Sequence, residues 1–202
     1  MKLRACIFLF LSFTIFFASC KKDDDTGSCS NCPDDDLINA QYDPQPYNLE
    51  IPEWLPEPVI PEDNPMTVAG VALGRALFYE TKLSSDGSMS CGSCHLQEKA
   101  FTDGEATSRG VLGMNGTRSS MAIINLAFNT NGFFWDGRAA TLEEQALMPV
   151  EDHIELNENW GNVLEKLRKD PEYPALFKKE LWIDRKSEMN KELGTKAIAQ
   201  LE

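Results

Sequence analysis

Two cysteines followed at once by a histidine stand in the middle of the chain, as Cys91-Gly92-Ser93-Cys94-His95. This spacing is typical of covalent haem attachment, in which two thiols add to the vinyl groups of the porphyrin and the adjacent histidine binds the iron. A thioredoxin-type redox pair is less favoured because it needs a strand-turn-helix setting, and a zinc site would need a second pair of ligands. The sequence therefore predicts one covalent haem c, with His95 as the proximal ligand of its iron.

The second axial ligand of that haem is harder to assign, because the chain has only two histidines and His95 is already used. His153 could bind iron, but a histidine among acidic neighbours is more often a charge-paired structural residue. Met114, in a glycine-rich loop after the haem motif, could supply a thioether as in electron-transfer cytochromes. Methionines in loops usually only pack, so neither candidate is decisive.

The N-terminus has the pattern of an export signal. Two basic residues precede an uncharged run over residues 5–19, which is too short to span a bilayer comfortably as a helix. The run ends in Phe17-Ala18-Ser19-Cys20, which resembles the processing box of bacterial lipoproteins; the alternative is an ordinary signal peptide with an incidental cysteine. We therefore expect residues 1–19 to be a lipoprotein signal peptide. Acylated Cys20 would then anchor the exported protein to the outer membrane.

The charge of the mature chain bears on its partners. Removing residues 1–19 takes away two cations and no anions, so the net charge changes from −13 to −15. This acidity argues against nucleic acid as a partner. It could steer a basic redox protein, or it could simply keep an exported protein soluble.

Residues 20–64 are predicted to be an acidic, proline-rich tether without a fold of its own, since they lack any sustained apolar periodicity. Cys29 and Cys32 lie in this stretch with the spacing of the haem motif but no histidine after them. A disulfide is the leading explanation for this pair, and metal binding is the second.

The rest of the chain is predicted to be mainly α-helical. Asn64-Pro65 predicts a helix start, and Thr141 to Glu144 has the form of a capping box that opens a helix through Leu147. Residues 81–140 are rich in Gly, Ser and Asn and show no alternating strands, so we expect loops that wrap a haem. One face of the first helix should hold Val68, Val71, Leu73, Ala76 and Leu77. Further helices are expected at 158–169, 173–182 and 194–202.

Six motifs follow one another between about residues 70 and 181. They are Leu73-Gly-Arg-Ala-Leu-Phe78, Leu83-Ser-Ser-Asp-Gly-Ser-Met-Ser-Cys91, the Cys91 to His95 motif, Phe133-Phe-Trp-Asp-Gly-Arg138, Leu142-Glu-Glu-Gln-Ala146 and Pro149 through Leu156. In order and spacing they resemble the N-terminal haem domain of the bacterial di-haem cytochrome c peroxidases, whose relatives include the methylamine-utilisation maturases. The resemblance implies a mainly α, cytochrome c-like haem domain with long loops over residues 65–182, preceded by a disordered tether.

The resemblance also implies roles for individual residues. In that family a glutamine and a glutamate stand on the distal side of the N-terminal haem, where peroxide binds, and the pattern matches at Gln145 and Glu155. Glu155 would move a proton between the two peroxide oxygens, and Gln145 would orient the peroxide. Trp135 resembles the family tryptophan that relays electrons between two haems, the alternative being a buried aromatic anchor. Arg138 would pair with a haem propionate or with an aspartate such as Asp136.

The sequence departs from the family pattern in two places. The loop over residues 110–116 lacks the distal histidine of peroxidases that need reductive activation, and Val111 stands about where it would be. The haem is therefore expected to be open and five-coordinate, as in the maturase-like branch. The calcium-binding asparagine of the family, which would follow Arg118, is replaced by Ser119, so a calcium site is doubtful.

The chain stops at Glu202, inside a helix that in the family leads into a second haem domain. Residues 183–202 are therefore predicted to be a linker and the start of that domain, which would be missing from a fragment, a split gene or a relic. The favoured function is reduction of hydrogen peroxide with electrons from a small donor protein such as a cytochrome c. A separate second haem domain or a homodimer partner is left open. The alternatives are a mono-haem electron-transfer cytochrome and a non-catalytic haem-binding remnant.

Overall fold

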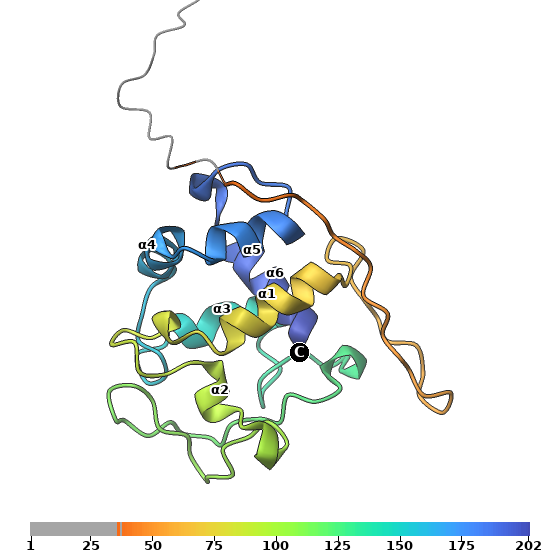
Figure 1. Cartoon of the computed structure of the whole chain (residues 1–202). Helices are drawn as coiled ribbons and strands as arrows, with labels where there is room; N and C mark the ends of the chain where they lie inside the picture. The colour runs from red at the N-terminus through yellow and green to blue at the C-terminus, as the bar shows by residue number, and fades with distance from the viewer. Residues whose placement is uncertain (1–35, 37) are drawn as a thin grey trace, which may run out of the picture. The chain divides into compact units, whose positions relative to one another are not determined.

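Helices and long loops make up the part of the chain that the computed structural model describes, residue 36 and residues 38–202 (Figure 1). Within these residues there is no strand, only isolated β-bridges, so the fold is mainly α with long loops, as predicted. The α-helices are α1 (Val68–Phe78), α2 (Cys91–Cys94), α3 (Leu142–Glu151), α4 (Trp160–Lys169), α5 (Tyr173–Glu180) and α6 (Lys191–Leu201). Short 3-10 helices lie between them, η2 (Thr81–Leu83), η3 (Gln97–Lys99), η4 (Leu126–Phe128) and η5 (Lys186–Glu188).

The centre of the helical core is the contact between α1 and α6, and α6 also packs on α3. Leu73 and Leu77 of α1 and Ala197 and Ile198 of α6 are almost completely buried. The two helices come close because α1 presents glycine to α6. A Cβ on Gly74 would lie 1.9 Å from the carbonyl oxygen of Ala197. Any side chain at this position would push the helices apart.

The start and the buried face of α1 differ from the prediction. Thr67, rather than Asn64-Pro65, caps the helix, and its Oγ1 accepts a hydrogen bond from the amide of Gly70 at 2.9 Å. Val68, predicted on the buried face, is exposed because α6 packs on the glycine side of α1. The buried residues of α1 are Gly70, Leu73, Gly74, Leu77 and Phe78.

The other predicted helices are present, with shifts at their ends. Thr141 caps α3, since its Oγ1 accepts a hydrogen bond from the amide of Glu144 at 3.1 Å. The Glu144 carboxylate accepts one from the amide of Ala140 at 2.8 Å. α3 runs past its predicted end and includes Pro149. α4, α5 and α6 correspond to the helices predicted at 158–169, 173–182 and 194–202.

Parts of the segment over residues 38–64 contact the helices, although the sequence predicted a tether over 20–64. The amide of Ile38 donates to the carbonyl of Asp184, and the amide of Asp43 donates to that of Lys179, both at 2.9 Å. Ile38 is buried, and the extended segment passes α5 (orange in Figure 1). The start and the end of this segment are thus docked on the helices, whereas Trp54 and Val59 in its middle are largely exposed. Asp36 of the predicted tether is also described, and its carboxylate accepts from the hydroxyl of Ser187 at 2.8 Å. The signal peptide, Cys20, Cys29 and Cys32 lie outside the described residues.

A buried polar network holds the docked segment to the C-terminal helices. The Gln200 amide nitrogen donates to Glu180 at 2.9 Å and to Asn64 at 3.0 Å, and its oxygen accepts from the Thr67 amide at 2.9 Å. The Thr67 hydroxyl also donates to Glu180. The carboxylate of Glu180 is therefore hydrogen-bonded although it is buried.

Residues 183–202 belong to this same core, which differs from the domain boundary predicted at residue 182. Ile183 and Met189 are buried, as are Ala197 and Ile198 of α6. Because α6 packs on both α1 and α3, it completes the helical core rather than beginning a separate one.

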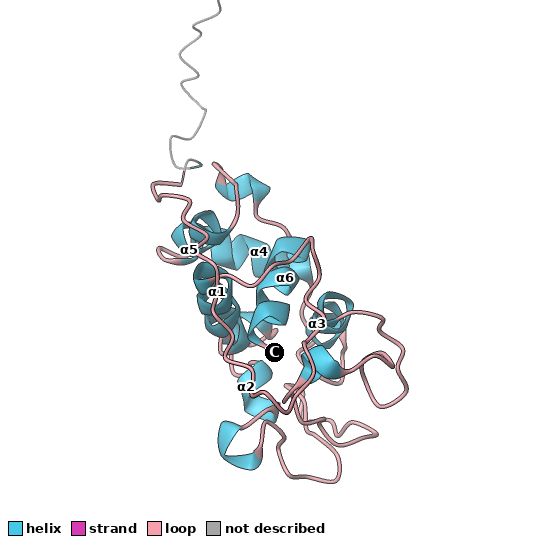
Figure 2. Ribbon diagram, turned by 90° about the vertical axis from the view of Figure 1, so that its right-hand side faces the viewer, coloured by secondary structure: helices cyan, strands magenta, loops and turns pink. Residues whose placement is uncertain are grey.

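The loops between α2 and α3 gather at one end of the helices, below α2 and beside α3 (Figure 2). They contain η3 and η4 but no longer helix. Among the described residues, no helix combines the length and the apolar character needed to cross a membrane.

Candidate functional site

A cavity of about 420 Å³ lies between the loops and the helices. Its volume falls in the range of roughly 300–1,000 Å³ that is usual for sites of small molecules and cofactors. Apolar side chains, including Leu126, Phe133 and Ala146, form part of its wall. The residues that the sequence singled out for haem and peroxide all line it: Cys91, Cys94, His95, Trp135, Arg138, Gln145 and Glu155.

The two cysteines are free thiols on one face of α2. Their spacing of three residues places them one helical turn apart, which the single turn of α2 provides. The hydroxyl of Ser93 accepts a hydrogen bond from the amide of Ser90 at 3.0 Å and helps to close the start of this turn. Burial raises the pKa of Cys91 to about 12 and that of Cys94 to about 11, so both are thiols at neutral pH.

His95 follows α2, and its ring is oriented by the backbone. The imidazole Nδ1 lies 2.9 Å from the carbonyl oxygen of Phe101. A carbonyl can only accept, so Nδ1 carries the proton and Nε2 keeps its lone pair for a metal. Burial lowers the pKa of His95, and the backbone of Phe101 and Met121 opposes this shift. Because Ala100 and Phe101 both have left-handed backbone conformations, the chain turns back at this point.

Gln145 and Glu155 lie in the cavity wall, on α3 and on the loop that follows it. Burial raises the pKa of Glu155; the charge of Asp152 adds to this shift and that of Arg138 opposes it. The amide of Val111 donates to the carbonyl oxygen of Glu155 at 2.8 Å. The position predicted to have lost the distal histidine is therefore next to Glu155.

The two candidates for a sixth iron ligand are not in the cavity wall. Met114 is exposed, and so is His153, whose Nδ1 lies 3.6 Å from the Oδ1 of Asp152. Neither residue is therefore placed to reach a haem in the cavity as the structure stands, and both stay untested as iron ligands.

A charged cluster forms another part of the cavity wall. Asp136 accepts from Arg138 at 3.0 Å and from Arg118 at 2.9 Å, and these hydrogen bonds lower its pKa to about 2. The guanidinium of Arg138 lies over the ring of Phe134, 3.5 Å from its centre. Trp135 donates from Nε1 to the carbonyl oxygen of Ser119 at 2.9 Å. Trp135 is 61% exposed and lines the cavity.

The profile of a protein family described as di-haem cytochrome c peroxidase matches residues 68–202, more than half of the chain. The chain belongs to the di-haem cytochrome c peroxidase family. This confirms the resemblance seen in the six motifs, and the cavity residues fall within the matched range.

Relatives at the level of sequence include peroxidases and a methylamine utilization protein. The chain is 44% identical over 124 residues to the cytochrome c peroxidase IdrP1 of Denitromonas iodatirespirans, a match that covers 61% of this chain and 33% of that protein. It is 40% identical over 127 residues to the methylamine utilization protein MauG of Methylorubrum extorquens, covering 63% and 35%. The chain thus spans about a third of the length of these relatives.

A solved structure supports the fold assignment. The crystal structure of a MauG-like protein associated with microbial copper homeostasis superposes with a TM-score of 0.69 at 31% identity. The match covers 77% of this chain and 45% of that one. The helices and the loops around the cavity are therefore a fold of this di-haem peroxidase family.

Arg118 and Glu202 are among the cavity-wall residues that were not predicted as site residues. Arg118 reaches Asp136 across 18 positions of loop, and no local spacing in the sequence signals this ion pair. Glu202 at the end of α6 lines the cavity, and burial raises its pKa to about 8. Glu202 was not considered as a site residue because residues 183–202 were predicted to belong to a linker and a second domain.

Proposed function

We propose that this member of the di-haem cytochrome c peroxidase family carries one covalent haem c and reduces hydrogen peroxide. The proposal rests mainly on the set of side chains that line the cavity. One space brings together two free thiols, a histidine with Nε2 available, and a glutamate whose pKa is raised.

The cavity residues fit a covalently held haem. Cys91 and Cys94 would each add a thiol across a vinyl group, and neutral His95 would bind iron through Nε2. Arg118 and Arg138 would pair with the haem propionates, since two guanidinium groups share the single carboxylate of Asp136. The bound haem would supply the iron at which peroxide binds and through which electrons arrive.

The protein's own side chains would handle the protons. Reduction of hydrogen peroxide consumes two electrons and two protons and yields two waters. Glu155 would take a proton from one peroxide oxygen and return it to the other, a task for which its buried carboxyl with a raised pKa is suited. Gln145 would hold the peroxide through its amide. Trp135, exposed in the cavity wall, would relay electrons.

The donor of these electrons is proposed to be a small redox protein such as a cytochrome c, acting directly or through a second haem domain. Relatives of the chain include cytochrome c peroxidases, which supports this class of donor. We also propose export, with acylated Cys20 as an anchor in the outer membrane; this part rests on the sequence alone. Palmitate labelling that is lost in Cys20→Ala would support the anchor, and an unlabelled, soluble wild type would contradict it.

The test of the catalytic proposal is Glu155→Gln in the haem-loaded chain. A general acid–base group contributes about 100- to 10,000-fold, so the reaction with peroxide followed by stopped-flow absorption should slow at least about 100-fold. The resting haem spectrum should stay the same. The matched control is Glu151→Gln, an exposed glutamate of α3 that does not line the cavity. Equal rates in wild type and Glu155→Gln, or a wild type that does not react, would contradict the proposal.

A further inference from the structure

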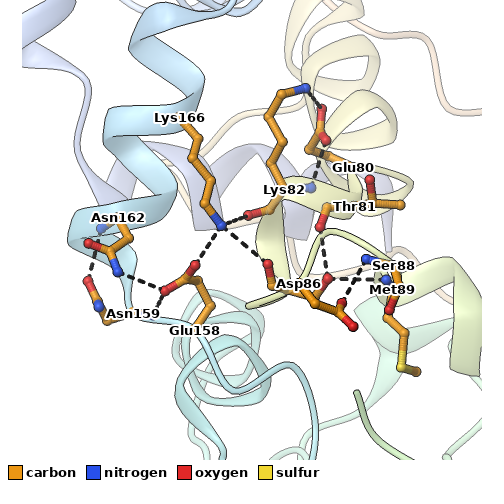
Figure 3. A network of polar contacts seen from close by, with 11 residues as sticks. Glu80, Thr81, Lys82, Asp86, Ser88, Met89, Glu158, Asn159, Asn162 and Lys166 are labelled. Carbon is orange, nitrogen blue, oxygen red and sulfur yellow. Dashed lines mark hydrogen bonds and ion pairs between the residues drawn. The ribbon is translucent and has the colours of Figure 1, made fainter. Parts of the chain in front are cut away.

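Lys166 of α4 stands where two segments next to the cavity meet (Figure 3). Its ammonium donates to the carbonyl oxygen of Lys82 at 3.2 Å, to that of Ser84 at 3.3 Å, and to Oε2 of Glu158 at 2.5 Å. An ammonium has three protons to donate, and each of these acceptors can take one. The network therefore uses the full capacity of Lys166.

The carboxylate of Glu158 is held on both oxygens. Its Oε1 accepts from the amide of Asn159 at 2.9 Å and from the side chain of Asn162 at 3.0 Å, while Oε2 accepts from Lys166. The side chain of Glu158 is only 9% exposed. Burial by itself would raise the pKa of Glu158, but these hydrogen bonds lower it, so the group stays charged. A charged carboxylate this well enclosed is costly without its cation.

Glu158 closes the loop that carries Glu155. Its own amide donates to the carbonyl of Val150 at 2.8 Å, which returns the chain to α3. Asn157, in a left-handed conformation, donates to the carbonyl of Asp152 at 2.9 Å. The loop over residues 152–158 is therefore short and tightly folded, and a shift of one end moves Glu155.

The segment over residues 82–90 and the loop around Val111 also contact the loop over residues 152–158 directly. The amide of Ser85 donates to the carbonyl of Leu156 at 3.0 Å, and Val111 donates to that of Glu155. Gly110 lies so close that a Cβ there would be 1.6 Å from the carbonyl oxygen of Ile154. The segment that contains Ser85 leads directly to Cys91.

From this geometry we infer that Lys166 is a positioning residue for Glu155. It ties the segment over residues 82–90, which ends at the haem-attachment motif, to the loop that carries the Glu155 carboxyl. Lys166 thereby sets where that carboxyl stands relative to the group bound at Cys91 and His95. The inference rests on the proposed role of Glu155, because a displacement of about 1 Å in a reacting group can cost roughly 100-fold in rate.

The first experiment compares three substitutions in the haem-loaded chain. Lys166→Met should slow the reaction with peroxide by about 10- to 100-fold, while haem content and the resting spectrum stay the same. Lys166→Arg keeps the charge and should recover most of the rate. Lys169→Met is the matched control, since Lys169 lies on the same helix and pairs with Glu165 at 3.7 Å with both side chains largely exposed. It should react like the wild type.

A double substitution separates positioning from general stability. If Lys166 acts through Glu155, then Lys166→Met should slow the Glu155→Gln protein by less than about twofold, because the two effects are not independent. Effects that multiply would overturn the inference. A slow Glu155→Gln protein beside a fully active Lys166→Met protein would overturn this inference alone. A fully active Glu155→Gln protein would overturn the proposed function.

Amide hydrogen exchange gives a readout that does not depend on activity. The amides of Ser85 and Val111 should exchange faster in Lys166→Met and should be unchanged in Lys169→Met. If Lys166→Met does not fold, Glu158→Gln provides the second variant, since it keeps the size of the side chain and removes its charge. It should slow the reaction in the same direction and by a smaller factor. An unchanged rate in Glu158→Gln would overturn the inference.

Discussion

The helical part of the molecule and its loop part are held together in different ways. In α1, α4, α5 and α6, buried apolar side chains pack directly on one another, with Leu73, Leu167 and Phe177 fully enclosed. Between residues 95 and 140 only Phe133 and Ala139 are buried apolar residues. The same stretch holds most of the non-glycine residues with left-handed backbone, Ala100, Phe101, Asn125 and Phe134.

This difference shows what each part contributes. The helices have a hydrophobic core of their own. Many loop side chains line the cavity instead of packing on one another. Residues held in sparsely populated conformations cost roughly 1–3 kcal/mol each and tend to cluster at functional sites. The backbone conformations that shape the cavity therefore destabilise the loop part. The haem of the proposed function would stabilise the loop part by making apolar contacts with its side chains.

The largest expected effect comes from removing the haem attachment. Cys91→Ala with Cys94→Ala should abolish covalent haem, measured by mass spectrometry after acid–acetone extraction. Amide exchange should then rise over residues 95–138 and stay slow in α1 and α6, because only the loops depend on the bound group. Cys29→Ala with Cys32→Ala should keep the haem. Faster exchange in both parts would show that the helices also depend on the bound haem, which would contradict the difference described above.

The stability of the helical part should fall most when a large side chain of its own core is removed. Leu77 is completely buried, so Leu77→Ala should lower the free energy of unfolding by about 2–5 kcal/mol, measured by urea denaturation. Val68→Ala, at an exposed position of the same helix, should change it by less than about 0.5 kcal/mol. The cost of Leu77→Ala should be similar with and without haem. A cost that appears only in one of the two forms would mean that the parts do not act separately.

The smallest effect concerns the charges around Glu155. As a base, Glu155 acts when deprotonated, so the rate should rise with pH through its raised pKa. Asp152→Asn removes a charge that raises this pKa and should move the profile to lower pH by a fraction of a unit. Arg138→Gln removes a charge that lowers it and should move the profile to higher pH. Neither should alter the urea midpoint of the helices. Shifts in the same direction would contradict this assignment.

Local signals predicted the helices well and long-range contacts poorly. The cap at Thr141 and the apolar patterns of α4, α5 and α6 lie within a few residues of the helices they define, so they could be seen in the sequence. The cap at Thr67 was missed because Asn64-Pro65 offered a competing start. The docking of Ile38 on Asp184 was missed because a backbone hydrogen bond needs no particular side chain.

The candidate site divides in the same way. The attachment motif and the family motifs led to seven residues that line one cavity, since each motif carries its own spacing. Arg118 and Lys166 contact partners whose carboxylates come from other segments of the chain. Charged side chains are common on surfaces, and the sequence does not show which of them meet. The assignment of α6 to another domain failed because its apolar face matches α1, a fit seen only after folding.

The docking of Ile38 on the helices shortens the reach of chain between Cys20 and the haem cavity. From Cys20 to Asn64 a fully extended chain reaches about 150 Å, but from Cys20 to Ile38 it reaches only about 60 Å. If Cys20 is the anchor, as proposed above, the cavity would be kept within this shorter reach of the membrane. A shorter tether raises the effective concentration of the anchored protein for partners anchored to the same membrane. The docked segment would thus favour redox partners held on the same membrane over partners that diffuse freely.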